Sequence, residues 1–135
     1  MGLVADSCLQ SGGQAMGVIT DFLMELEVGH KGLTELLVVK SMHERKQKMA
    51  DLSALFVALP GGWGTLDELA EILTWNQLHL IDKPVAVLNV NGFFTPLKAA
   101  MEKMVAEGFL KETNLAKIFW ANTPHELFAW IDQLR

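Results

Sequence analysis

The residues best suited to chemistry lie in one glycine-rich segment, Pro60-Gly-Gly-Trp-Gly-Thr65, which is followed three residues later by Glu68. An apolar run at residues 55–59 precedes this segment and a helical pattern follows it from about Thr65, so the expected order is strand, turn and helix. The glycines allow positive φ angles and carry no Cβ, so a ligand can approach the main chain. The unpaired N–H groups and the positive dipole end of the helix favour an anion, and a phosphate fits this arrangement best.

Two other interpretations of this segment stay open. A tight connection between strand and helix also explains the glycines, since the pattern is neither the Walker loop nor the dinucleotide fingerprint. Thr65 and Glu68 have the spacing of a capping box, in which Thr65 caps the helix and Glu68 accepts a hydrogen bond from the Thr65 N–H. A capping glutamate and a catalytic glutamate look the same in sequence, so Glu68 is a candidate for either role.

A second polar cluster, residues 43–48 with the sequence His-Glu-Arg-Lys-Gln-Lys, is basic within a chain of net charge -5. Arg45 and Lys46 fall in the first turns of a helix that we expect to start at Ser41, where positive charge opposes the helix dipole. Ordinary solvated surface is one explanation. The other is an anion bound between Arg45 and the glycines at 61–64, because arginine forms paired hydrogen bonds with phosphate.

Short apolar segments and helical patterns alternate along the rest of the chain. We expect strands at residues 15–19, 34–39, 55–59, 85–90 and 118–120. We expect helices at residues 2–11, from 21, from 41, at 65–79, from 95 to about 107 and from 123. The alternation predicts an α/β fold, a Rossmann-like three-layer domain with a parallel sheet and helices on both faces. Both polar clusters then follow strands at the carboxyl edge of the sheet, where ligands bind in such folds.

Composition limits the classes of function. With 135 residues, half of them apolar, the chain is expected to form a single domain over residues 1–135. The negative charge argues against a nucleic-acid partner, and no apolar run reaches the roughly twenty residues of a membrane span. The only cysteine, Cys8, is expected to be packed rather than reactive, which predicts a cytoplasmic protein. The four histidines lack metal-ligand spacing, so no metal is expected.

Several motifs together resemble the Lonely Guy family, the cytokinin riboside 5'-monophosphate phosphoribohydrolases. They are Met42-His-Glu-Arg-Lys46, Pro60-Gly-Gly-Trp-Gly-Thr-Leu-Asp-Glu68, Thr74-Trp-Asn-Gln-Leu78, and Lys83-Pro84 followed by Leu88-Asn-Val-Asn-Gly92. The resemblance runs from Met1 to the end of the chain. Older labels call such proteins lysine decarboxylase-like, but the sequence has no apparent pyridoxal-phosphate site.

The resemblance implies hydrolysis of the N-glycosidic bond of a nucleoside 5'-monophosphate, a cytokinin riboside 5'-monophosphate or AMP, to free base and ribose 5-phosphate. It implies that Arg45 and Glu68 are the catalytic pair and that Met42 and Lys46 line the base pocket. The 5'-phosphate is expected on the N–H groups of Gly61, Gly62, Gly64 and Thr65. The resemblance also implies a homodimer or higher homo-oligomer with a shared active site, and no cofactor is expected.

Family members carry an upstream strand and a glycine-rich nucleotide loop that ends in Gly-Leu-Met-Gly, and here only Met1-Gly2 match its end. We therefore expect a domain that is N-terminally incomplete relative to the family. The alternative function is a non-catalytic nucleotide- or phosphate-binding module that the missing segment leaves inactive. Trp63 is expected either to stack on a ligand or to pack at a subunit interface.

Overall fold

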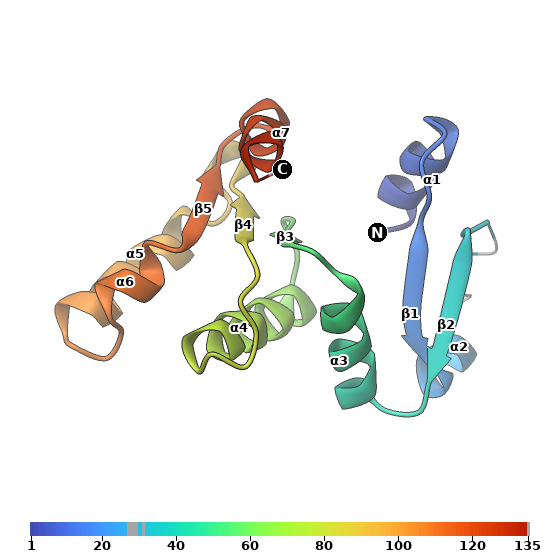
Figure 1. Cartoon of the computed structure of the whole chain (residues 1–135), viewed down its shortest axis with the longest axis horizontal. Coiled ribbons are helices and arrows are strands. Elements are labelled where there is room, and N and C mark those ends of the chain that lie inside the picture. Colours follow the sequence, from blue (N-terminus) through green and yellow to red (C-terminus); the bar gives the residue numbers. More distant parts are fainter. Residues whose placement is uncertain (27–29, 31, 135) are drawn as a thin grey trace. The chain divides into compact units, whose positions relative to one another are not determined.

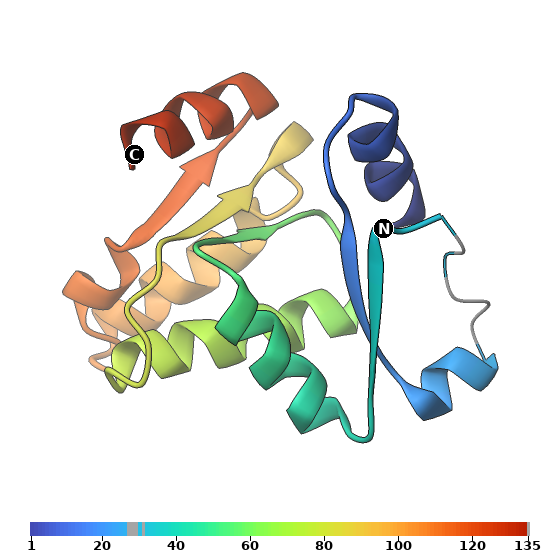
Figure 2. The ribbon, with the colours of Figure 1, turned by 45° about the vertical axis from the view of Figure 1, so that its right-hand side comes forward.

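The computed structural model describes residues 1–26, 30 and 32–134. Residues 1–53 and residues 54–135 form two compact units, each with its own parallel sheet (Figures 1 and 2). The predicted α/β class with parallel strands is confirmed. That the whole chain acts as a single domain stays a prediction.

In the described residues of the first unit, a two-stranded parallel sheet is accompanied by three helices. Its elements are α1 (Gly2–Gln10), β1 (Met16–Thr20), α2 (Asp21–Leu26), β2 (Glu35–Val39) and α3 (Met42–Leu52). In the register of the two strands, Met16 lies opposite Glu35 and Thr20 lies opposite Val39. Gly29, which together with Gly32 suggests a loop in the sequence, lies outside the described residues.

The connection from α1 to β1 requires its glycines. Gly12 has a φ of 79°, which favours glycine. A Cβ on Gly13 would lie 2.7 Å from the Cys8 sulfur, so the thiol occupies the space of a side chain there. The Cys8 thiol also donates a hydrogen bond to the Gln14 carbonyl at 3.3 Å, in agreement with a packed rather than reactive cysteine.

The helix expected from residue 21 is present as α2. Asp21 is a residue type that often caps a helix, but here Thr20 is the cap, because its hydroxyl accepts a hydrogen bond from the Leu23 N–H at 3.3 Å.

On α1, Leu3 is 84% exposed and Val4 is 52% exposed, whereas Cys8 and Leu9 of the same apolar face are half-buried. A two-stranded sheet offers too little area to cover this helix.

The second unit is a three-stranded parallel sheet in the order β3-β4-β5. Its elements are β3 (Phe56–Ala58), α4 (Trp63–Gln77), β4 (Val85–Leu88), the 3-10 turn η1 (Val90–Gly92), α5 (Thr95–Ala106), α6 (Glu112–Leu115), β5 (Ile118–Ala121) and α7 (Pro124–Gln133). Figure 2 shows α7 on one face of this sheet and α4 and α5 on the other. This is the three-layer arrangement that the alternating sequence predicts.

The core of the second unit forms around β4. All four residues of this strand are buried, and Ala86 and Leu88 pack with Ala121 of β5 and Leu127 of α7. By contrast, β3 is only half-buried, although the apolar run at residues 55–59 suggests a strand that is covered on both faces. It is an edge strand of its sheet, so only one of its sides is covered by a neighbouring strand.

Asn89 fixes the carboxyl end of β4. Its side-chain carbonyl accepts from the Phe94 N–H at 2.6 Å, and its amide donates to the Thr95 hydroxyl at 3.1 Å. The chain turns between them at Asn91 and Gly92, whose φ angles are 53° and 70°, and Asn-Gly is a residue pair that favours such a turn. Asn89 therefore sets where α5 begins.

Among the described residues, no helix combines the length and the apolar character that crossing a membrane requires.

We predict that Phe94→Ala lowers the free energy of unfolding by about 3–5 kcal/mol, because Phe94 is 2% exposed and its loss leaves a cavity. Phe109→Ala is the control, since Phe109 is 85% exposed, and it is expected to cost no more than about 0.5 kcal/mol. Urea denaturation followed by tryptophan fluorescence measures both. Equal effects of the two substitutions would contradict the proposed core.

Candidate active site

Helix α4 begins two residues earlier than the sequence indicated. It starts at Trp63 with Gly62 as its N-cap, so Thr65 is the third helical residue. The predicted capping box of Thr65 and Glu68 is therefore wrong, because a capping side chain must stand before the helix. Glu68 lies one turn into α4 and is half-buried. Capping does not explain its presence.

The three glycines of the loop have different surroundings. A Cβ on Gly61 would lie 2.2 Å from the Thr65 hydroxyl oxygen, whereas a Cβ on Gly62 or Gly64 would meet nothing within 4 Å. Among the described residues, glycines with positive φ are Gly12, Gly92 and Gly108, and the loop glycines are not among them. The loop thus uses glycine for close approach to the main chain rather than for left-handed backbone.

The N-termini of α3 and α7 are closed by side chains. The Ser41 hydroxyl accepts from the Glu44 N–H at 3.1 Å, and the Glu44 carboxylate accepts from the Lys40 N–H at 2.9 Å. Thr123 and Glu126 repeat this arrangement at α7, with distances of 3.2 Å to Thr123 and 2.7 Å to Glu126. The helices expected from residues 41 and 123 are confirmed, and each has its N-cap at that residue.

The N-terminus of α4 is different. Within the described residues, no side chain caps it and its first turn contains no acidic residue. Residues 60–64 are exposed, and Trp63 reaches 88% exposure. The N–H groups of the first turn lack acceptors inside the helix. Among the described helices, α1 and α5 also begin without a side-chain cap, so it is the exposed glycine loop before α4 that makes this end suit an external anion.

Arg45 lies on the first turns of α3, where Met42, Arg45 and Lys46 have the i, i+3, i+4 spacing that places side chains on one face of a helix. Arg45 and Lys46 are half-buried, and Met42 is exposed. The Arg45 Nε donates a hydrogen bond to the Val18 carbonyl of β1 at 3.0 Å. Arg45 is therefore not an ordinary solvent-exposed surface residue.

Arg45 also lines a cavity of about 290 Å³ in the first unit. Most of the lining is apolar, and the residues are Gly17, Val18, Ile19, Leu23, His30, Leu33, Leu36 and Arg45. A guanidinium at the edge of an apolar cavity can hold a charged group while the apolar walls contact the rest of a ligand.

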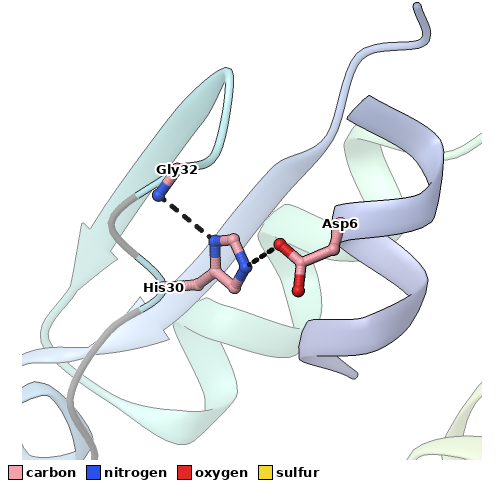
Figure 3. Close-up of polar contacts among 3 residues, drawn as sticks. All are labelled: Asp6, His30 and Gly32. Carbon is pink, nitrogen blue, oxygen red and sulfur yellow. Dashed lines mark hydrogen bonds and ion pairs between the residues drawn. The ribbon is translucent and has the colours of Figure 1, made fainter. Parts of the chain in front are cut away.

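His30 lies in the wall of the same cavity and is held from two sides (Figure 3). Its Nε2 lies 2.8 Å from the Asp6 carboxylate, and the Gly32 N–H donates to its Nδ1 at 3.2 Å. Since Nδ1 accepts, the proton of the neutral ring is on Nε2 and is donated to Asp6. The contact between His30 and Asp6 joins residues that are 24 positions apart, and no local sequence signal predicts it.

The predicted site residues are distributed over both units. Met42, Arg45 and Lys46 belong to residues 1–53, and the segment from Gly61 to Glu68 belongs to residues 54–135. The pairing of Arg45 with Glu68 therefore joins residues of different units and stays a prediction.

The comparison with known proteins gives the same family as the sequence motifs around Arg45 and Glu68. The model of a family described as possible lysine decarboxylase matches residues 1–131. The chain is 46% identical over 133 residues to a probable cytokinin riboside 5'-monophosphate phosphoribohydrolase of Oryza sativa subsp. japonica. It is 45% identical over 111 residues to a cytokinin riboside 5'-monophosphate phosphoribohydrolase of Arabidopsis thaliana, and 44% identical over 119 residues to one of Rhodococcoides fascians. The chain belongs to the Lonely Guy family.

The match to these Lonely Guy proteins covers most of this chain but only part of each relative. It includes 98%, 82% and 87% of this chain and 60%, 49% and 60% of the respective relatives. The chain thus spans about half to three fifths of the length of these Lonely Guy relatives.

We predict opposite effects of alanine at two loop glycines. Gly61→Ala should lower the free energy of unfolding by about 1–3 kcal/mol, because the new Cβ would overlap the Thr65 hydroxyl. Gly64→Ala should raise it by about 0.5 kcal/mol, because Gly64 is helical and its Cβ would face open space. Urea denaturation measures both. Adding Thr65→Ala to Gly61→Ala should recover most of the loss, and no recovery would show that the Gly61–Thr65 contact is not the cause.

Proposed function

We propose that this Lonely Guy chain hydrolyses the N-glycosidic bond of a nucleoside 5'-monophosphate, a cytokinin riboside 5'-monophosphate or AMP, to free base and ribose 5-phosphate. The observation that carries the proposal is the open N-terminus of α4 behind an exposed glycine loop. Family membership and the names of the relatives support the reaction type.

The 5'-phosphate is proposed to bind the N–H groups of Gly61, Gly62, Gly64 and Thr65. The Thr65 hydroxyl lies against Gly61, so it is close to the main chain of the same loop and adds a donor there. The helix dipole adds favourable interaction with the negative charge. The uncapped start of α4 and the open space around Gly62 and Gly64 support this role.

Glu68 is proposed as the catalytic carboxylate. Thr65 and Glu68 are spaced i, i+3, so they share one face of α4 and the carboxylate lies one turn from the proposed phosphate site. Cleavage of an N-glycosidic bond builds positive charge on the ribose, which a carboxylate stabilises. The same group can activate the attacking water as a general base.

Arg45 is proposed to hold the nucleotide and to offset its negative charge, with Met42 and Lys46 lining the base pocket. Their shared face on α3 and the position of Arg45 in the cavity wall support this assignment. Arginine suits the role because its planar group forms paired hydrogen bonds with anionic oxygens.

We also propose a homodimer or higher homo-oligomer with a shared active site in a cytoplasmic setting. Exposed Leu3 and Val4 on α1 support an interface, because large apolar side chains in contact with water favour association. The single, packed Cys8 suits a reducing compartment.

The direct test is incubation with AMP and with isopentenyladenosine monophosphate, followed by chromatography of the free base. Glu68→Gln is expected to lower kcat at least about 100-fold with nucleotide affinity retained, because the amide keeps the shape but cannot act as a base. Glu102→Gln is the matched control, since Glu102 is an exposed residue of α5, and it should leave kcat unchanged. Nucleotide binding without base release in the unmodified chain would favour the non-catalytic binding module.

A second prediction concerns Arg45. Arg45→Lys keeps the charge but loses the paired donors, so KM for the nucleotide should rise by about tenfold or more. Lys48→Met, at an exposed position of the same helix, removes a charge and should change KM less than twofold. Steady-state kinetics on both variants measures this. Similar KM values in the two variants would assign Arg45 to structure alone.

A further inference from the structure

His30 bridges α1 and the segment that leads into β2 (Figure 3). Its Nε2–H donates to the Asp6 carboxylate of α1 at 2.8 Å, and its Nδ1 accepts from the Gly32 N–H at 3.2 Å. A neutral imidazole makes both bonds at once only with its proton on Nε2, because one ring nitrogen must donate and the other must accept. The ring thus has a defined partner on each side.

The segment after His30 lies against the first residues of β1. A Cβ on Gly17 would lie 2.7 Å from the Leu33 Cδ1 atom, so a side chain at position 17 would displace Leu33. The Thr34 N–H donates to the Ala15 carbonyl at 2.9 Å, and the Thr34 hydroxyl accepts from the Ala15 N–H at 3.0 Å. The two segments are therefore in direct contact through both side chains and main chain.

Arg45 is bound to the next part of the same strand. Its Nε–H donates to the Val18 carbonyl at 3.0 Å, and His30 and Leu33 line the same cavity of about 290 Å³ as Arg45. A long arginine side chain has many rotamers, and a fixed acceptor selects among them. A shift of β1 at Val18 therefore moves the acceptor that orients Arg45.

The contact between His30 and Asp6 is too exposed to act mainly through stability. The side chain of His30 is 28% exposed and that of Asp6 is 48% exposed. Ion pairs and polar pairs in contact with water contribute little to the free energy of unfolding. Such a contact can still fix the direction of a segment, and the precise orientation of a functional side chain depends on support of this kind.

We propose that His30 is a positioning residue for Arg45. Together with Asp6, it fixes Leu33 against β1, and β1 carries the carbonyl that accepts from the Arg45 Nε. The consequence for substrate binding rests on the proposed function, in which Arg45 holds the nucleotide. The consequence for the orientation of the Arg45 side chain does not depend on any reaction.

The test uses the full chain labelled with 15N and the variant His30→Gln. The glutamine amide can donate to Asp6 from the place of Nε2, but it leaves no acceptor at the place of Nδ1. In this variant the Arg45 Nε–H should exchange with solvent at least about tenfold faster, because its acceptor is no longer fixed. The amide of Ala50, a buried residue of α3, is the internal control and should exchange as before. His125→Gln, at an exposed position of α7, is the matched control and should leave the Arg45 signal unchanged.

Substitutions of Asp6 test the other side of the bridge. Asp6→Leu removes the acceptor and should speed exchange of the Arg45 Nε–H as His30→Gln does. Asp6→Asn keeps an acceptor oxygen and should retain most of the protection. In the unmodified chain, the ring 15N signals of His30 should show a protonated Nε2 and an unprotonated Nδ1, and this measurement requires no variant.

Steady-state kinetics with AMP tests the consequence for binding. KM should rise about three- to tenfold in His30→Gln and in Asp6→Leu, with kcat within about twofold of the unmodified chain. An unmodified chain that releases no base would count against the proposed function, while the exchange measurements still test the role of His30. That role is overturned if both variants leave the Arg45 Nε–H unchanged, if the Ala50 amide accelerates equally, or if the ring proton is on Nδ1.

Discussion

The open N-terminus of α4 is the constraint on which the proposed site depends. Each helix begins with N–H groups that have no acceptor within the helix. Ser41 with Glu44 closes α3, and Thr123 with Glu126 closes α7, whereas α4 begins at a glycine. The Thr65 hydroxyl packs against Gly61, which determines the path of the loop into the helix. The first donors of α4 have no acceptor within the helix, so an anion can accept from them.

Arg45 links the proposed chemistry to the edge of the first sheet. A half-buried guanidinium requires acceptors, and the Val18 carbonyl supplies one of them. Under the proposed function, the nucleotide is a further acceptor for this guanidinium.

The order of strands and helices could be predicted from the sequence because apolar runs, glycines and prolines act locally. The start of α5 at Thr95-Pro96, its end shortly before Gly108, and the turn at Asn91-Gly92 follow from such local chemistry. Two features could not be predicted in this way, the helix α6 and the partial burial of β3. The four-residue helix α6 is too short for a periodic signal, and the burial of β3 depends on its position at the edge of a sheet.

In the candidate site, too, some features follow from the local sequence and others only from the fold. Caps at α3 and α7 were predictable from Ser or Thr followed three residues later by Glu, but the same spacing at Thr65 and Glu68 was misleading. The glycines before Thr65 let the helix start earlier than the pattern indicated. The contact between His30 and Asp6 joins α1 to the segment before β2, and only the fold brings them together.

The most direct measurement is a 15N chemical-shift titration of the chain with AMP. Binding of the 5'-phosphate to the start of α4 predicts saturable shifts of the Gly62, Trp63, Gly64 and Thr65 amides. The amides at the capped start of α7, such as Glu126, should stay unchanged. Shifts of equal size at both helices, or none at α4 with millimolar AMP, would contradict the account.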